Sequence, residues 1–190
     1  EWGVFQAHCY PYEAHASTMV VLASEATWRR AGLDGMSEAE SLAFTQAVFQ
    51  AELGDGHRML SNRSLWLNFP WVACESWHAG KVVILGDAAH TAHFSIGSGT
   101  KLAMEDAMSL AACIHEDTSL ESALTTYEQE RKAVVLSTQR AAQASLEWFE
   151  NLGQYVDQDP LQFAFNIMTR SRRVTYDNLR VRDPEFVGRC

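Results

Sequence analysis

The residue types best suited to hold a cofactor lie in residues 81–107, which read KVVILGDAAHTAHFSIGSGTKLAMEDA. Asp87 follows Gly86 at the end of an apolar run, and its ionised carboxylate only accepts hydrogen bonds, so beside a cofactor it should meet sugar hydroxyls. Gly97 and Gly99 allow a close approach of backbone to ligand because they carry no Cβ. A helix that starts near them would present unpaired N–H groups and a partial positive charge. The stretch therefore predicts a strand, a loop and a helix N-terminus that favour an anion or an electron-rich carbonyl.

Two common phosphate-binding motifs do not fit this stretch. Residues 97–102, GSGTKL, lack the third glycine of a dinucleotide fingerprint, and residues 99–101 invert the Lys-Thr order of a P-loop. His90 and His93 stand three residues apart, but no third ligand or carboxylate is spaced with them. We therefore expect no metal site and assign no catalytic acid or base here.

The order of these residues resembles the second FAD-binding motif of the single-component flavin-dependent aromatic hydroxylases, the p-hydroxybenzoate hydroxylase-like group. The shared pattern is GDAAH at residues 86–90, then Gly97-x-Gly99, then EDA at residues 105–107. The variant HTAHFSIGSGTKLAMEDA, with the later LEWFENLGQYV and RSRRVTYDNLRVRDP, resembles the salicylyl-CoA 5-hydroxylase and anthraniloyl-CoA monooxygenase branch. The general resemblance covers mainly residues 77–115, and the branch resemblance extends over most of the chain.

The resemblance implies a role for each part of the motif. Asp87 would hold the ribityl chain, and N–H groups from about Gly99 to Lys101 would stabilise negative charge on the N1–C2 edge of the reduced flavin. Two positions depart from the wider group: Phe94 stands where proline is common beside the flavin ring, and Lys101 where asparagine is common, so only the backbone of Lys101 is given a role. The implied FAD-binding residues are Gly86, Asp87, Ala88, His93, Phe94, Ser95, Gly97, Gly99, Thr100 and Lys101, of which 93–95 pass close to the ring.

By the same resemblance the activity is a flavin-dependent monooxygenation, in which NAD(P)H reduces FAD and the reduced flavin activates oxygen to hydroxylate an activated aromatic ring. An aryl-CoA thioester such as salicylyl-CoA or 2-aminobenzoyl-CoA is the implied substrate. Two other functions stay open, a flavin-dependent halogenase or reductase and a non-catalytic helical interaction module that retains the motif.

The sequence contains no G-x-G-x-x-G turn, which in this group holds the FAD pyrophosphate after an N-terminal strand. We therefore interpret the chain as the C-terminal part of a longer protein, whose N-terminal FAD-binding half is its partner. Alone, these residues should be inactive and prone to self-association, because the apolar strand at 82–85 would lack neighbours.

Composition narrows the class of protein. The chain has 190 residues, of which 47% are apolar, and this predicts a globular protein of one or two domains. A net charge of -9, without a basic stripe interleaved with aromatic residues, argues against a nucleic-acid partner. No run approaches the roughly 20 apolar residues that span a membrane. The cysteines are scattered, which favours reduced thiols in a cytoplasm; they are Cys9, Cys74, Cys113 and Cys190.

The predicted fold class is α/β (α+β in this fragment), the C-terminal part of a FAD/NAD(P)-binding flavin monooxygenase fold. Strands at 3–12 and 17–24 would form a β-hairpin. The resemblance implies that this hairpin is the end of the substrate-domain sheet, so Tyr10 is a candidate for lining the aromatic pocket, with ordinary sheet packing as the alternative. A capping box at 37–40 starts a helix to about residue 52, and alternation predicts a strand at 65–69. The expected domains are 1–76, the end of the substrate-binding sheet and a connecting helix; 77–115, the second FAD motif; and 116–190, a helical region.

Around the motif, the run at 82–85 predicts a strand buried on both faces. The helix after it should bury one face, the next helix should extend from 120 to about 149, and Asp159-Pro160 should start another. The C-terminal segment is rich in arginine, and Arg172 and Arg173 are candidates for binding the phosphates of a CoA thioester, with a solvated or inter-domain surface as the alternative. The expected buried face of the motif helix is Ala103, Ala107, Leu110 and Ile114.

Overall fold

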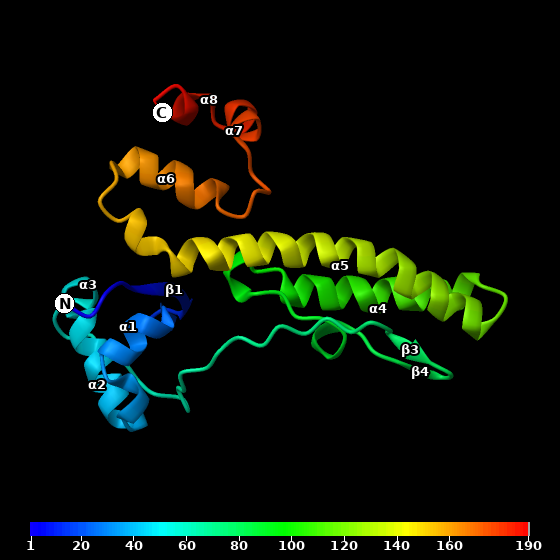
Figure 1. Ribbon diagram of the computed structural model, residues 1–190, viewed down its shortest axis with the longest axis horizontal. Coiled ribbons are helices and arrows are strands. Elements are labelled where there is room, and N and C mark those ends of the chain that lie inside the picture. The colour runs from blue at the N-terminus through cyan, green and yellow to red at the C-terminus, as the bar shows by residue number, and fades with distance from the viewer. Residues whose placement is uncertain (190) are drawn as a thin grey trace. The chain divides into compact units, whose positions relative to one another are not determined.

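The computed structural model of the chain describes residues 1–189, so Cys190 lies outside the described residues. The chain divides into two compact units, Glu1–Asn68 and Phe69–Cys190 (Figure 1). In residues 1–189, every helix is too short or too polar to cross a membrane. The mixture of helices and short sheets agrees with the predicted α/β class.

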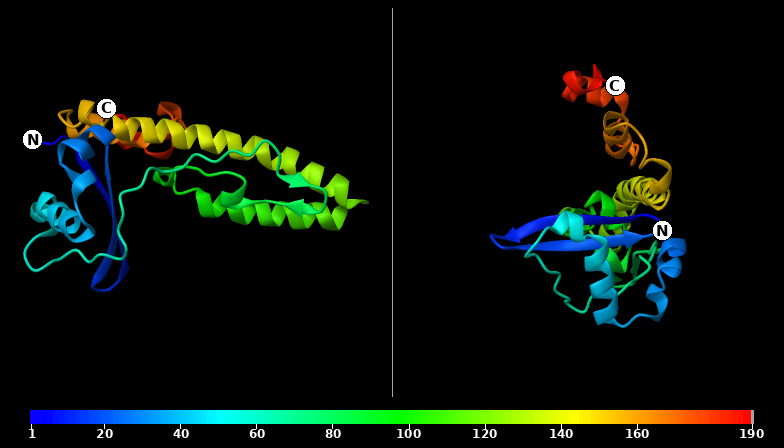
Figure 2. Two further views of the ribbon diagram at one scale, coloured as in Figure 1. Left: turned by 60° about the horizontal axis from the view of Figure 1, so that its bottom comes forward. Right: turned by 90° about the vertical axis from the view of Figure 1, so that its left-hand side faces the viewer.

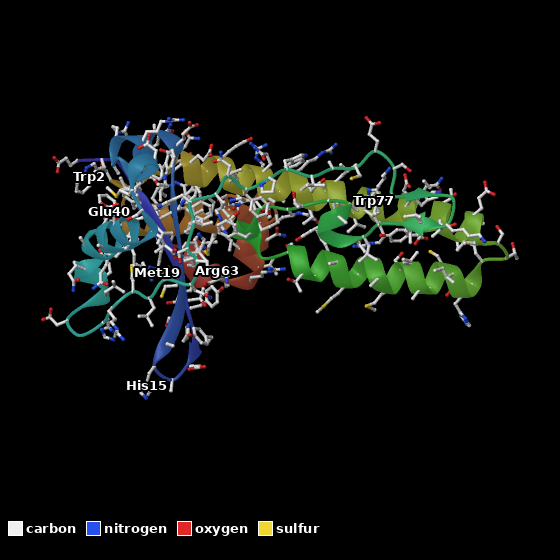
Figure 3. All side chains as sticks on the ribbon, turned by 90° about the horizontal axis from the view of Figure 1, so that it is seen from below. Trp2, His15, Met19, Glu40, Arg63 and Trp77 are labelled. Atoms are coloured by element: carbon white, nitrogen blue, oxygen red, sulfur yellow. The ribbon has the colours of Figure 1, made fainter. Side chains whose placement is uncertain are left out.

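The first unit contains the predicted β-hairpin. Strands β1 (Phe5–Glu13) and β2 (Ala16–Ala23) pair antiparallel, with Phe5 opposite Ala23 and an irregularity in register between Pro11 and Glu13 (Figure 2). His15 lies at the tip of this hairpin (Figure 3). The helices of the unit are α1 (Glu25–Arg30), α2 (Glu38–Val48) and α3 (Gln50–Leu53).

Helix α2 begins as its sequence predicts but ends early. The side chain of Ser37 accepts a hydrogen bond from the N–H of Glu40, and the Glu40 carboxylate accepts one from the N–H of Ser37, which is a capping box. Helical structure reaches Leu53, close to the predicted end at about residue 52, but it is interrupted at Phe49, whose φ of −103° separates α2 from α3.

The predicted strand at 65–69 is also wrong. These residues form no strand, and Leu65 and Leu67 are 68% and 81% exposed. A strand needs a neighbour for its backbone groups, and no strand among residues 1–189 pairs with this segment. The half-buried Trp66 instead packs towards α2, where its indole N–H donates to the hydroxyl of Ser41 at 2.7 Å.

In the second unit two long helices run side by side. Helix α4 (Gly99–Glu116) is followed, after a short turn, by α5 (Leu120–Glu150), which confirms the predicted 30-residue helix (Figure 1). Segment 70–91 lies along the same pair of helices, and Trp77 is buried there (Figure 3). The chain ends in α6 (Pro160–Thr169), α7 (Tyr176–Arg182) and α8 (Pro184–Val187), and Asp159 caps α6 as predicted. The buried apolar core consists of Trp77, Ala89, Ala92, Leu102, Cys113, Ala123, Tyr127, Val135 and Ala142.

The predicted strand at 82–85, buried on both faces, is wrong. Only Val82–Val83 forms a strand, β4, and it pairs antiparallel with β3 (His78–Ala79). Val82 is 69% exposed, and Ile84 is held by other groups: its N–H donates to the carbonyl of Trp77 at 2.8 Å, and its carbonyl accepts from the Tyr127 hydroxyl at 3.2 Å. No strand among residues 1–189 lies parallel to this run, so it has no ladder to extend it.

The buried face of α4 differs from the predicted one. Of the predicted positions, Leu110 packs against the core and Ala103 is half-buried, but Ala107 and Ile114 are exposed. The fully buried residues of α4 are Leu102, Asp106 and Cys113. The reason is that the face towards α5 contains a buried carboxylate, which a count of apolar positions omits. On the opposite side Met104 and Met108 are 63% and 72% exposed, so α4 keeps an apolar surface in this structure.

Candidate cofactor site

Gly86 begins the motif with a turn that requires glycine. Its φ is +57°, and a Cβ at this position would lie 3.0 Å from the Cβ of Ala103 on α4. The turn continues as a short 3-10 helix, η2 (Gly86–Ala88), in which the Gly86 carbonyl accepts from the N–H groups of Ala89 and His90. The close approach places η2 against α4.

Asp87 projects from this turn. The residue is exposed, as is Ala88, and its carboxylate forms no hydrogen bond or ion pair with any residue in the described range 1–189. A carboxylate without a protein donor is an available acceptor for hydroxyl groups of a ligand. This is the environment that the sequence predicts for a residue that holds a sugar-like chain.

The buried carboxylate of Asp106 on α4 holds this turn, a role that the sequence analysis did not assign to it. Asp106 is 0% exposed and accepts from the N–H of Gly86 at 3.0 Å, from Nε2 of His90 at 2.6 Å and from Nε of Arg131 at 2.8 Å. Because an ionised carboxylate only accepts, Nε2 of His90 carries the proton. Arg131 also donates to Glu105 at 3.2 Å.

A signal for this network was present in the sequence. Asp106 follows Leu102 by four residues, which puts both on one helix face, and a charge on a buried face requires partners. His90 is therefore a structural donor to Asp106. Among residues 1–189 no three His, Cys, Asp or Glu side chains are placed to hold a metal ion, so no metal centre is formed by them.

The side chain of Lys101 is committed to its own helix. It forms an i,i+4 ion pair with Glu105, and this hydrogen bond holds the pKa of Glu105 below its usual value. The side chain of Lys101 is otherwise solvent-exposed. The role implied for the backbone N–H of Lys101 stays a prediction.

In the loop between the turn and α4, residues 93–96 are held by hydrogen bonds and ring contacts. Residues Phe94–Ile96 form a 3-10 helix, η3, and the His93 Nδ1 atom lies 2.8 Å from the Ser95 hydroxyl. His93 and Ser95 are buried, whereas Phe94 is 38% exposed. The His93 ring also contacts the ring of Phe69, with centroids 5.2 Å apart.

In the part of this loop that contains Gly97 and Gly99, no other atoms of residues 1–189 pack on the side-chain side of either glycine. Gly97 has φ +62°, and a Cβ at Gly97 or Gly99 would meet no atom within 4 Å. Ser98 does not cap α4, because its hydroxyl donates to the carbonyl of Ile96. Within residues 1–189, no acceptor takes the N–H groups of 99–101. The helix N-terminus is thus available to an electron-rich group of a ligand.

Helix α5 fixes these segments with polar side chains on one face. Gln139, 1% exposed, donates to the carbonyls of Val72 and Thr91 at 2.9 and 2.8 Å. Ser145, 0% exposed, accepts from the Ser95 hydroxyl at 2.8 Å. Tyr127 binds the Ile84 carbonyl, as described above, and burial raises the pKa of its hydroxyl. The long helix was predicted, but its role as the support of the motif was not.

The predicted substrate residues belong to both units. Tyr10 is 54% exposed on β1 of the first unit, while Phe94, Arg172 and Arg173 belong to the second. Arg173 donates to the hydroxyl of Ser137 on α5 at 3.1 Å. Arg172 has φ +58° and lines an open cleft of about 250 Å³, whose walls are Trp71, Arg140, Gln143, Ala144, Glu147 and Arg172.

This geometry agrees with a comparison to known proteins. The family described as FAD binding domain matches residues 7–142, and the chain belongs to this family. The open glycine loop, the uncapped helix and the free carboxylate of Asp87 all lie inside the matched residues, and together they offer a cofactor backbone donors and one acceptor.

Several curated proteins are similar to the chain. A salicyloyl-CoA 5-hydroxylase from Streptomyces sp is 44% identical over 98% of this chain and 38% of its own length. A 3-hydroxy-4-methyl-anthranilyl-(aryl-carrier protein) 5-monooxygenase from Streptosporangium sibiricum is 43% identical over 77% of this chain and 38% of its own. A protodeoxyviolaceinate monooxygenase from Chromobacterium violaceum is 36% identical over 89% and 45%. The chain thus spans less than half the length of these relatives.

Proposed function

We propose that the protein containing this chain is a FAD-dependent monooxygenase that hydroxylates an activated aromatic ring, with NAD(P)H and O₂ as co-substrates. One observation carries the proposal: the free carboxylate of Asp87 and the uncapped N-terminus of α4 flank an open glycine loop. Membership of the FAD-binding family and three relatives named as hydroxylase or monooxygenases support it.

Each residue of the motif has a defined share in this function. Asp87 accepts hydrogen bonds from the ribityl hydroxyls, and the turn of Gly86 and Ala88 sets its position. The N–H groups of Gly99, Thr100 and Lys101 stabilise negative charge at the pyrimidine edge of the ring. FAD supplies the activation of oxygen when bound. The residues that flank the ring are His93, Phe94, Ser95 and Gly97, and none of them is given an acid–base role.

We infer further that the substrate is an aryl thioester, and two relatives are named for a CoA or carrier-protein substrate. In this chain the cleft beside Trp71 offers an exposed indole ring and the guanidinium groups of Arg140 and Arg172. No ion pair in the described residues involves either arginine, so both can meet phosphate oxygens. Arg173 is a further candidate for contacting the phosphate groups of the thioester. Tyr10 and Phe94 are the candidates for contacting its aromatic ring.

The division of the chain into 1–76, 77–115 and 116–190 is part of this proposal. An N-terminal half of the same protein would complete the FAD site by holding the pyrophosphate. The exposed apolar side chains of Met104, Met108 and Val82 suit a surface that this half covers. The proposed location is the cytoplasm, where NAD(P)H and thioester substrates are available.

The test is made on the full-length protein as purified. We expect a flavin absorption spectrum and NAD(P)H oxidation that is stimulated by salicyloyl-CoA and yields a hydroxylated thioester. Halide ions added to the assay separate the alternatives, because a halogenase would release a halogenated product. A full-length protein that binds no flavin would exclude the proposal and favour a non-catalytic module.

A further inference from the structure

Arg170 reaches from the end of α6 to the loop of the candidate site. Its Nη2 atom donates to the carbonyl of Ser95 at 2.8 Å, and its Nε atom donates to the hydroxyl of Ser145 at 3.0 Å. A third bond, from Nη1 to the Ile167 carbonyl at 2.6 Å, anchors the guanidinium to α6. The guanidinium carbon also lies 5.1 Å from the centre of the Phe149 ring. A residue 75 positions later in the chain thus holds the loop.

The partners of Arg170 leave its charge uncompensated. Its hydrogen bonds go to two carbonyls and one hydroxyl, and no carboxylate in the described residues forms an ion pair with it. Arg131, the other arginine bound to the motif, lies against Asp106 and Glu105. The chain has 24 acidic and 15 basic residues, so the missing counter-ion of this half-buried arginine is not explained by a shortage of acidic residues.

A half-buried cation without a counter-ion is costly to folding, because its hydration is lost without a charge to replace it. Burial accordingly lowers the pKa of the Arg170 guanidinium. Charged groups whose pKa is shifted by burial occur often at functional sites, where they act on a ligand. The contact of Arg170 with the motif loop indicates that the ligand group on which its charge acts is the one bound at that loop.

Ser95, whose carbonyl accepts from Arg170, lies two residues before Gly97 in the uncovered part of the loop. The Ser95 hydroxyl bonds to Ser145, its side chain lies against His93, and two residues later the chain reaches the open backbone of Gly97. The partial positive charge at the N-terminus of α4 begins at Gly99. The charge of Arg170 and the helix dipole therefore have the same sign at the same loop.

We propose that Arg170 is a positioning residue of the flavin site, which fixes the turn from His93 to Gly97 and, through its charge, raises the reduction potential of the bound flavin. The inference rests on the proposed FAD site. A hydride carries two electrons and one proton, so its transfer from NAD(P)H adds one unit of negative charge at the ring. A fixed positive charge stabilises the site more after this transfer than before it.

The experiment compares variants of the full-length, FAD-loaded protein. Arg170→Gln removes the charge, Arg170→Lys keeps it, and Ser145→Ala keeps the guanidinium but removes one acceptor. Arg180→Gln is the matched control, since it removes an exposed arginine of α7 that is paired with Asp177 and has no role in the site. The readouts are the reduction potential of the bound flavin and the dissociation constants of oxidised and reduced FAD.

For Arg170→Gln we expect the reduced form to lose affinity relative to the oxidised form by on the order of tenfold, which for a two-electron couple corresponds to a potential lower by about 30 mV. Arg170→Lys and Ser145→Ala should retain most of the wild-type potential, and Arg180→Gln all of it. A potential unchanged in Arg170→Gln, or lowered equally in Arg170→Lys, would overturn the inference and leave Arg170 as an anchor of α6.

If Arg170→Gln does not fold, the comparison of Arg170→Lys with wild type decides the matter, because retained charge should keep the potential. A lowered potential in that variant would refute the electrostatic role. Failure of this inference differs from failure of the proposed function: a full-length protein that binds FAD and hydroxylates, but shows no charge dependence, keeps the function and loses only the role of Arg170.

Discussion

Asp106 accepts a hydrogen bond from the backbone N–H of Gly86 at 3.0 Å, and this contact joins the middle of α4 to the turn that precedes the motif loop. The contact lies inside the molecule, where Asp106 is fully buried. One carboxylate thus sets both the start of the loop and the position of the helix at its end. The geometry of the candidate site depends on a residue that does not face the ligand.

Asp106→Asn should destabilise the protein by about 3 kcal/mol, the lower end of the cost of breaking a buried ion pair, because Arg131 loses its buried partner and keeps only the partly exposed Glu105. Urea unfolding of the full-length protein measures the loss. Asp55→Asn is the control, since Asp55 is exposed in a loop. Equal stability of the two variants would show that the carboxylate of Asp106 is not needed to hold Arg131 and Gly86.

Asp87→Ala should weaken FAD binding with little effect on folding. The carboxylate is exposed and has no protein partner in residues 1–189, so its loss removes only a charge-assisted acceptor for the ligand, worth roughly 1.5 to 3 kcal/mol. This corresponds to a dissociation constant about ten- to a hundredfold higher. Flavin titration measures it, with the exposed Glu116→Ala at the far end of α4 as the control. An unchanged constant would remove Asp87 from the site.

Local signals in the sequence predicted many of the elements. The capping box of Ser37 and Glu40, the Asp159-Pro160 start of α6 and the long α5 were all predictable, because each depends on residues close together in the chain. The glycine loop was predictable for the same reason: the positive φ of Gly86 and Gly97 is a local requirement.

Contacts between distant residues were not predictable in this way. The bond from Asp106 to His90 spans 16 residues, and that from Arg170 to Ser95 spans 75. The run at 82–85 has the composition of a buried strand, but composition does not say whether a neighbouring strand is present to pair with it. Prediction from the sequence therefore failed where the structure depends on pairing between strands or on a buried polar contact between distant residues.

Glu128 should make stability depend on pH in the acid range. Burial acts to raise its pKa, but hydrogen bonds from Lys132, the N–H of Trp77 and His78 lower it to about 2 from 4.5. A depressed pKa gives stability that is present above about pH 4.5 and is lost as the pH falls towards 2, a contribution on the order of 3 kcal/mol.

The measurement is the free energy of unfolding of wild type and Glu128→Gln at several pH values. The difference between them should shrink as the pH falls from about 4.5 to 2, while the exposed Glu130→Gln should follow wild type throughout. A difference that is constant with pH would mean that Glu128 contributes through packing rather than charge.

Neutralising Arg172 and Arg173 together should raise the KM for an acyl-CoA substrate about tenfold or more, since each charge-assisted bond to phosphate is worth roughly 1.5 to 3 kcal/mol. Arg172→Gln alone should account for most of the change, because Arg173 is already bonded to Ser137. The rate of flavin reduction by NAD(P)H should be unaffected.

Two controls make this assignment specific. Arg180→Gln removes an arginine that is paired with Asp177 on α7 and should leave the KM unchanged. The corresponding pantetheine thioester lacks the nucleotide phosphates, so its KM should be the same for wild type and the double variant. A KM for the acyl-CoA that does not move would make this cleft an ordinary surface.

The 190 residues expressed alone should be colourless. A flavin dinucleotide is held both at its ring and at its pyrophosphate, and the glycine turn that holds the pyrophosphate in this class of fold is not among these residues. Loss of several hydrogen bonds to charged oxygens, each worth roughly 1.5 to 3 kcal/mol, lowers the affinity by several powers of ten. The motif loop can therefore be correctly shaped and still retain no FAD.

The same 190 residues should also associate with one another. Met104, Met108 and Val82 are 63%, 72% and 69% exposed, and within residues 1–189 β4 pairs with β3 alone, so apolar surface and unpaired strand groups are left open to a second copy. Visible absorption before and after addition of FAD, together with sedimentation velocity, tests both expectations. A yellow, monomeric preparation that oxidises NAD(P)H would show that the ring-side motif alone holds the cofactor, and that the pyrophosphate contacts are not what determines its affinity.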